Sequence, residues 1–126
     1  MYQRTHSTYV LEKEYLIIAL VKAKSEIFGE NFITLSELSE FERLIELEFN
    51  RHDINAVITS DSISMENFDM IGDVIFISKN CCYHLGFVPI IIAKILTDKN
   101  LIINFFQQLE NDKLNKLKIM KHNISN

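Results

Sequence analysis

Residues 9–28 read YVLEKEYLIIALVKAKSEIF, a stretch without glycine or proline. The apolar residues recur at helical spacing and, at about 100° per residue, cover more than half of the circumference of a helix. A helix that is apolar on so much of its surface packs against several neighbours, so we expect it to be central in the fold. Gly29 follows as a natural stop, because glycine readily adopts the left-handed conformation that ends many helices.

A second helix is predicted from Thr34 to about Asn50. Thr34 and Glu37 have the spacing of a capping box, in which a hydroxyl and a carboxylate accept hydrogen bonds from backbone N–H groups at the helix start. The apolar side chains that form the inward stripe of this helix are Leu38, Phe41, Leu44 and Ile45. The side chains outside that stripe include Glu40, Glu42, Glu46 and Leu47. Arg43 is three residues from two of these glutamates and is expected to neutralise them in part.

Two short segments have the character of strands. Residues 54–59 (INAVIT) are β-branched with partial alternation, and residues 73–78 (DVIFIS) hold a short apolar run between turn-forming residues. The polar segment 60–72 between them suits a loop or one helical turn. An antiparallel pair is the simpler expectation, although a parallel pair that crosses over through residues 60–72 is also compatible with the pattern.

The last third of the chain predicts two further helices. Pro89 is a favoured first helical residue, and Thr97-Asp98 resembles the N-cap of a following helix. The inward stripe expected in that last helix is formed by Ile102, Phe105, Phe106 and Leu109, extended by Leu117 and Met120 beyond a weak point at Asn111-Asp112.

The expected fold class is therefore α+β and mainly α. Four to five helices pack in one domain, residues 1–126, with a small two-stranded β element formed by residues 54–59 and 73–78. Residues 1–7 and 121–126 are expected to fray, because chain ends make few contacts. The length allows a core that needs neither metals nor disulfides.

Charge is strongly segregated along the chain, although the formal net charge is only −4. Residues 26–73 hold twelve acids and two bases, whereas residues 1–25 carry +2 and residues 74–126 carry +4. A block of one sign attracts basic ligands and repels phosphates. The acidic block therefore favours a basic partner, or else serves as a solvated face that keeps an apolar protein soluble.

Composition argues against several classes of protein. The start of the chain shows no apolar signal segment, and the longest apolar run, residues 85–96, is shorter than the ~20 residues that span a bilayer. Cys81 and Cys82 are adjacent, so they join no distant parts of the chain. We expect a cytoplasmic protein without a membrane segment and without a cofactor.

The candidate catalytic groups are few. Cys82 and His84 form a thiol–imidazole pair, and His52 lies beside Asp53. We favour the simpler explanation for both: a small buried or semi-buried cysteine after a strand, and a solvated helix end. A zinc site needs about four ligands, and no second pair of Cys or His completes one, so we expect no metal.

The negative charge of the predicted second helix disfavours direct binding to nucleic acid. The helix at residues 35–50 carries five glutamates, which would face phosphates if it entered a groove. The basic residues near the C-terminus, Lys113, Lys116, Lys118 and Lys121, are the alternative contact, but cations are ordinary in the last turns of a helix.

The leading hypothesis is a non-catalytic binding protein that presents an acidic face to a basic protein partner. An immunity protein or antitoxin that neutralises a nuclease toxin fits, because a nuclease is positive where it binds phosphate. The predicted contact residues are Glu40, Glu42, Glu46, Leu47, Asp53, Asp61, Glu66 and Asp69. The alternatives are a small enzyme using Cys82, His84 or His52, an acidic mimic of DNA, and a structural subunit of a homo-oligomer, a homodimer included.

Overall fold

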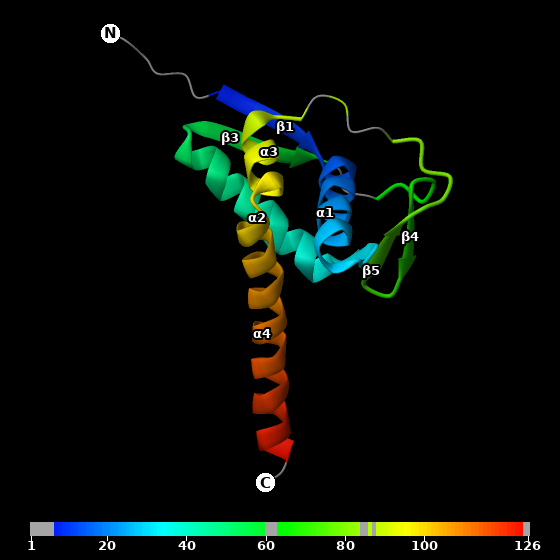
Figure 1. Cartoon of the computed structure of the whole chain (residues 1–126), viewed down its shortest axis with the longest axis vertical. Helices are drawn as coiled ribbons and strands as arrows, with labels where there is room; N and C mark the ends of the chain where they lie inside the picture. The colour runs from blue at the N-terminus through cyan, green and yellow to red at the C-terminus, as the bar shows by residue number, and fades with distance from the viewer. Residues whose placement is uncertain (1–6, 60–62, 84–85, 87, 125–126) are drawn as a thin grey trace.

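Helix α1 (Lys13–Phe28) lies at the centre of the molecule in the computed structural model, which describes residues 7–59, 63–83, 86 and 88–124 (Figure 1). In chain order the elements are β1 (Ser7–Glu12), α1, β2 (Phe32–Thr34), α2 (Leu35–Arg51), β3 (Ile54–Thr59), β4 (Phe68–Ile71), β5 (Val74–Ile77), α3 (Ile90–Thr97) and α4 (Lys99–Ile124). These four helices and five strands confirm a mainly helical α+β fold, but the β structure is larger than the predicted pair of strands.

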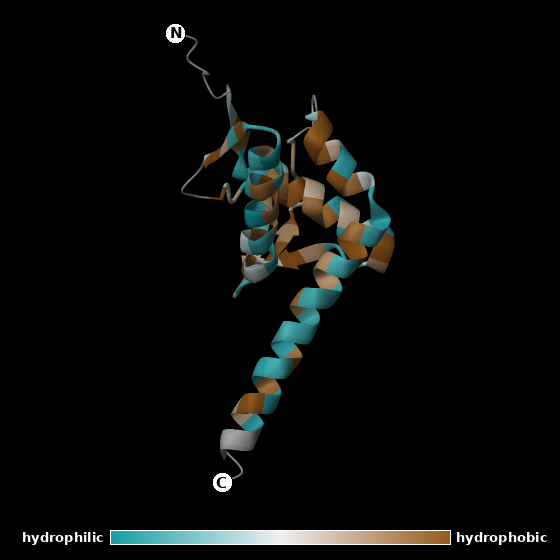
Figure 2. Ribbon diagram, turned by 90° about the vertical axis from the view of Figure 1, so that its left-hand side faces the viewer, coloured by the Kyte–Doolittle hydropathy of each residue, from teal (hydrophilic) through white to brown (hydrophobic). Residues whose placement is uncertain are grey.

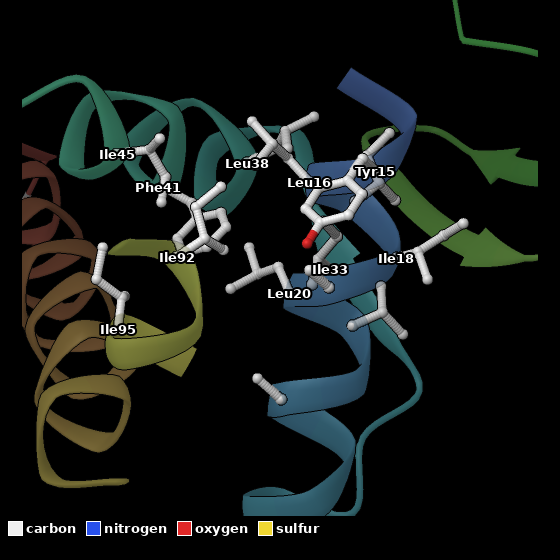
Figure 3. Packing of buried hydrophobic residues seen from close by; sticks show 14 of the residues in the cluster. Tyr15, Leu16, Ile18, Leu20, Ile33, Leu38, Phe41, Ile45, Ile92 and Ile95 are labelled. Atoms are coloured by element: carbon white, nitrogen blue, oxygen red, sulfur yellow. The ribbon is translucent and has the colours of Figure 1, made fainter. Parts of the chain in front are cut away.

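The buried surface of α1 confirms its predicted central position. Leu16, Ile17 and Leu20 are completely buried although they point in different directions around the helix. Figure 3 shows Leu16 and Leu20 on the side of α1 that faces α2, with Leu38 and Phe41, and α3, with Ile92. The apolar excess of this helix is thus used inside the fold, since each side of the helix has its own packing partner.

The predicted start of the first helix was wrong, because residues 7–12 form strand β1 instead. Tyr9 and Leu11 turn towards the core while Thr8 and Val10 point outwards, which is the alternation of a strand. β1 pairs in parallel with β3 in the register Val10↔Val57. These long-range backbone hydrogen bonds replace the local ones that a longer helix would have made.

The predicted antiparallel pairing of residues 54–59 with 73–78 was also wrong. β3 belongs to the two-stranded parallel sheet with β1, whereas β5 is the middle strand of a separate antiparallel sheet, β2-β5-β4. β4 lies within the segment expected to be a loop or a helical turn, and Gly72, at φ 63°, begins the tight turn to β5. β2 was missed because three residues, Phe32–Thr34, are too few to show a period.

The predicted helix ends are mostly confirmed. The hydroxyl of Thr34 accepts a hydrogen bond from the Glu37 N–H (3.1 Å), and the Glu37 carboxylate accepts one from the Thr34 N–H (2.8 Å). Gly29 caps α1 in the left-handed conformation at φ 71°. Asp98 accepts from the Leu101 N–H at the start of α4, as an N-cap does, whereas Pro89 precedes α3 instead of beginning it.

Helix α4 leaves the body of the protein (Figures 1 and 2). Its first half packs through Ile102 and Phe106, which are buried, but every residue from 111 to 121 is exposed. The predicted weak point at Asn111-Asp112 does not interrupt it, since the helix runs on to Ile124. Of the ends predicted to fray, 1–7 and 121–126, residues 1–6 and 125–126 lie outside the described residues, whereas Ser7 begins β1 and residues 121–124 continue α4.

Lys24 on α1 joins four elements near the point where α4 leaves. Its side chain is only 7% exposed, and its ammonium group lies 3.2 Å from Oε1 of Glu37 and 3.1 Å from Oε2 of Glu30. The ammonium also lies over two aromatic rings, 4.6 Å from the centroid of Phe32 and 5.3 Å from that of Phe106. The carboxylate that caps α2 is therefore also the counter-charge of a lysine on α1.

We predict that Lys24→Met lowers the free energy of unfolding by about 2–4 kcal/mol, because it leaves the Glu37 carboxylate without its buried counter-charge. Lys22→Met is the matched control, since Lys22 is exposed two residues away on the same helix, and its effect should stay within about 0.5 kcal/mol. Urea denaturation measures both variants. Equal effects of the two substitutions would contradict the role assigned to Lys24.

Candidate functional site

The structure uses part of the acidic block internally. Besides the two carboxylates at Lys24, Glu42 lies 3.6 Å from the ammonium of Lys13 on α1, and Glu48 pairs with Arg51 at 2.8 Å. Glu42 was predicted to face a partner, yet its side chain is only 22% exposed and points towards α1. The acids that remain available to a partner are therefore fewer than the sequence suggested.

The exposed side of α2 carries Glu40, Arg43, Glu46 and Leu47, which we call the α2 outer face. The opposite side of the helix is buried through Leu38, Phe41, Ile45 and Phe49. The predicted stripe is confirmed at Leu38, Phe41 and Ile45, whereas Leu44 is only partly buried. Leu47 is 55% exposed, and among the described residues neither Glu40 nor Glu46 forms an ion pair. The helix thus presents two carboxylates without an ion pair, with Arg43 between them, and an apolar side chain next to the second.

The other predicted contact residues do not join this face into one surface. Glu66 and Asp69 are exposed at the start of the β4–β5 hairpin, at one end of the body in Figure 1. Asp53, which has a positive φ of 58°, lies in the turn between α2 and β3 at the opposite end. Asp61 lies outside the described residues. The acidic block is therefore distributed around the molecule.

A cleft of about 480 Å³ lies between the start of α2 and the middle of α4; we call it the α2/α4 cleft. Glu37 and Glu40 line it from α2, and Asp73 lines it from the β4–β5 turn. The residues that α4 contributes are Phe106, Leu109, Glu110, Asp112, Lys113 and Lys116. No local pattern predicted this cleft, because its two sides are about 70 residues apart in sequence.

Cys82 and His52, the candidate catalytic residues that the structure describes, are not brought together. Cys82 is in the loop after β5, where its thiol donates a weak hydrogen bond to the Asn80 carbonyl (3.4 Å). His52 caps α2 at the far end of the body, and His84 lies outside the described residues. Within the described part of the chain, no three His, Cys, Asp or Glu side chains are placed to hold a metal ion.

A polar cluster that the sequence did not suggest holds the loops against the start of α1. Glu14 accepts hydrogen bonds from the Ser64 N–H (3.0 Å) and the Asn67 amide (3.2 Å), and Glu12 accepts one from the Tyr83 hydroxyl (2.5 Å). Partial burial, and then the hydrogen bond and negative charge of Glu12, raise the pKa of Tyr83 above its usual value near 10. This arrangement organises loops and contains no nucleophile beside a base.

Tyr15 lies next to this cluster and faces the core. Its hydroxyl is buried and has no hydrogen-bond partner among the described residues. Figure 3 shows the hydroxyl directed inwards, on the side of α1 that faces α3. Burial, and then the neighbouring Tyr9, raise the pKa of Tyr15. The residue therefore serves packing, and its inward direction keeps the hydroxyl away from any reactant in solvent.

Comparison with known proteins adds no relative: no protein-family model, no curated protein and no solved structure matches this chain. Among the helices that the structure describes, none combines the length and the apolar character needed to cross a membrane.

We predict that Tyr83→Phe lowers the free energy of unfolding by about 1 kcal/mol at neutral pH, because it removes the hydrogen bond to Glu12. The raised pKa of Tyr83 means that its contribution is complete below pH ~10 and is lost as the pH rises further, since the unfolded chain ionises first. Denaturation at neutral and alkaline pH should show the difference between the two proteins shrinking above pH ~10. A stability difference between Tyr83→Phe and wild type that stays constant or grows with pH would contradict this role of Tyr83.

Proposed function

We propose that this protein is a non-catalytic binding protein whose α2 outer face contacts a basic region of a protein partner. The observation that carries the proposal is the exposure of Leu47, 55%, next to Glu46 on a face that also carries Glu40; neither glutamate forms an ion pair among the described residues. An exposed leucine near the end of a well-packed helix gains free energy when a partner covers it.

The two kinds of side chain on this face have different roles. Burial of a leucine contributes about 1.5–3 kcal/mol, which is a large part of the affinity of a small interface. The carboxylates attract a positively charged partner over several ångströms and so raise the rate of association. Arg43 lies between them and lowers the field, so the face is acidic but not uniformly so.

The partner class that this chemistry favours is a protein with a positive surface, such as a nuclease toxin domain. A nuclease keeps lysines and arginines where it binds phosphate, and an acidic inhibitor competes with the substrate at that place. An immunity protein or antitoxin is the specific form of the proposal. This specific form is supported by the negative charge of the α2 outer face and by its exposed apolar residue, Leu47.

The alternative functions gain less support from the geometry. An acidic mimic of DNA needs an extended row of free carboxylates, but Glu37, Glu42 and Glu48 on α2 are paired with cations. An enzyme built on Cys82 and His52 would need the two side chains in contact, and they belong to opposite ends of the body.

The experiment is capture of basic proteins from an extract of the source cells on immobilised protein, followed by affinity measurements with the purified partner. We expect Leu47→Ala to weaken binding by about 10-fold or more. Ile71→Ala is the matched control, since Ile71 is 71% exposed on the β4–β5 hairpin, away from the α2 outer face, and should leave the affinity unchanged.

The electrostatic part has its own test. Glu46→Lys should lower the association rate and flatten its dependence on salt, because one attractive charge becomes repulsive. Partner affinity that is the same for wild type, Leu47→Ala and Glu46→Lys would overturn the proposal.

A further inference from the structure

A cavity of about 230 Å³ lies against β1 and the start of α1, and we call it the tyrosine cavity. Its lining includes Tyr9, Val10, Glu12, Tyr15, Tyr83 and Pro89. Three of the four tyrosines of the chain therefore line one small cavity. We propose that the tyrosine cavity binds the primary ammonium group at the end of a short alkyl chain, held between the Glu12 carboxylate, the Tyr15 hydroxyl and the tyrosine rings.

The tyrosine cavity leads from the surface into the body of the protein. Val10 and Glu12 are exposed, whereas Tyr15 and Pro89 are buried. The volume is far above the ~10–15 Å³ that one water molecule requires, but it is below the ~300–1,000 Å³ of pockets for drug-sized ligands. The cavity therefore has the size for one functional group on a short chain.

The hydroxyl of Tyr15 is a polar group of this cavity with unused bonding capacity. It is buried and has no hydrogen-bond partner among the described residues. Packing explains the ring of Tyr15, but a buried hydroxyl without a partner is destabilising. Figure 3 shows the hydroxyl on the side of α1 that faces α3, and Pro89, which immediately precedes α3, lines the cavity. A ligand inside the cavity, unlike a reactant in solvent, can donate a hydrogen bond to this hydroxyl.

Glu12 gives the tyrosine cavity a negative charge. Its carboxylate accepts a hydrogen bond from the Tyr83 hydroxyl (2.5 Å), but it forms no ion pair among the described residues. The neighbouring Lys13 lies 3.6 Å from Glu42 instead. Burial, the hydrogen bond to Glu12 and then the charges of Glu12 and Glu14 raise the pKa of Tyr83, so a second carboxylate also acts on this place. The cavity therefore attracts cations and repels anions.

The aromatic lining selects an organic cation. The faces of tyrosine rings attract ammonium groups. A hard metal ion takes six or more oxygen ligands, whereas this lining offers a single carboxylate beside its phenol groups. A primary ammonium group has three N–H donors, so it can donate to Glu12 and to the Tyr15 hydroxyl while its methylene groups contact the rings.

Titration of the full chain with butylammonium chloride at constant ionic strength tests the proposal. Tyrosine fluorescence reports on the cavity, because the chain has no tryptophan and three of its four tyrosines line this place. We expect a saturable change with butylammonium and none with butan-1-ol or butanoate, which have the same chain without the positive charge. The absence of a saturable change with butylammonium, or an equal change with butan-1-ol, would overturn the proposal.

Three variants test the assigned contacts. Glu12→Gln should weaken butylammonium binding by about 10-fold or more, because it removes the charge and keeps an oxygen that can accept from Tyr83. Tyr15→Phe should weaken binding by about 5-fold without lowering the stability of the free protein, since it removes only an unsatisfied hydroxyl. Glu26→Gln is the matched control: it makes the same change at an exposed glutamate near the other end of α1 and should leave the affinity unchanged.

Urea denaturation verifies that the three variants fold. Wild-type affinity in both Glu12→Gln and Tyr15→Phe would contradict the assigned contacts, and so would an equal loss in Glu26→Gln.

The ammonium group can belong to a small free amine or to a lysine side chain of a protein. A short peptide with one lysine, compared with the same peptide carrying methionine at that position, distinguishes these sources. Saturable binding of the lysine peptide assigns the site to a protein lysine, and binding of butylammonium alone assigns it to free amines; both results require the ammonium site. The cavity contains no residue of the α2 outer face, so this proposal and the proposed partner binding can fail separately.

Discussion

The contact between the ammonium of Lys24 and the carboxylate of Glu37 is the constraint on which much of the structure depends. It is enclosed by Phe32 and Phe106, so it joins α1, β2, the start of α2 and the first half of α4 at one point. A lysine buried to this extent is tolerated only when its charge is compensated on several sides. The capping box therefore stabilises the helix start and also supplies that compensation.

This arrangement changes the meaning of the acidic block. Carboxylates that suggest a surface in the sequence are divided between internal pairs, on Lys24 and Lys13, and the exposed α2 outer face. What remains exposed on α2 is a smaller patch, the α2 outer face, which ends at Leu47. The position of Phe106 beside Lys24 has a second consequence, because it anchors α4 at the start of α2 and so creates the α2/α4 cleft and the projecting half of the helix.

Local sequence patterns were sufficient to predict the features that depend on interactions between neighbouring residues. The capping box at Thr34, the glycine stop at Gly29 and the N-cap at Asp98 were all predicted, because each depends on side chains and backbone groups within four residues. The buried stripe of α2 was predicted for the same reason. Strand partners were not predicted correctly, because a strand is stabilised by its neighbour in space. β1 and β3 are neighbours in space, although two helices lie between them in the chain.

The sequence by itself determined the mainly helical α+β class, the central apolar helix and the segregation of charge, because composition and periodicity are properties of neighbouring residues. Only the tertiary structure decided that residues 7–12 are a strand, that Glu42 faces Lys13, and that the last half of α4 leaves the body. Each of these depends on contacts between segments distant in the chain, where the free energy of packing and pairing outweighs local preference.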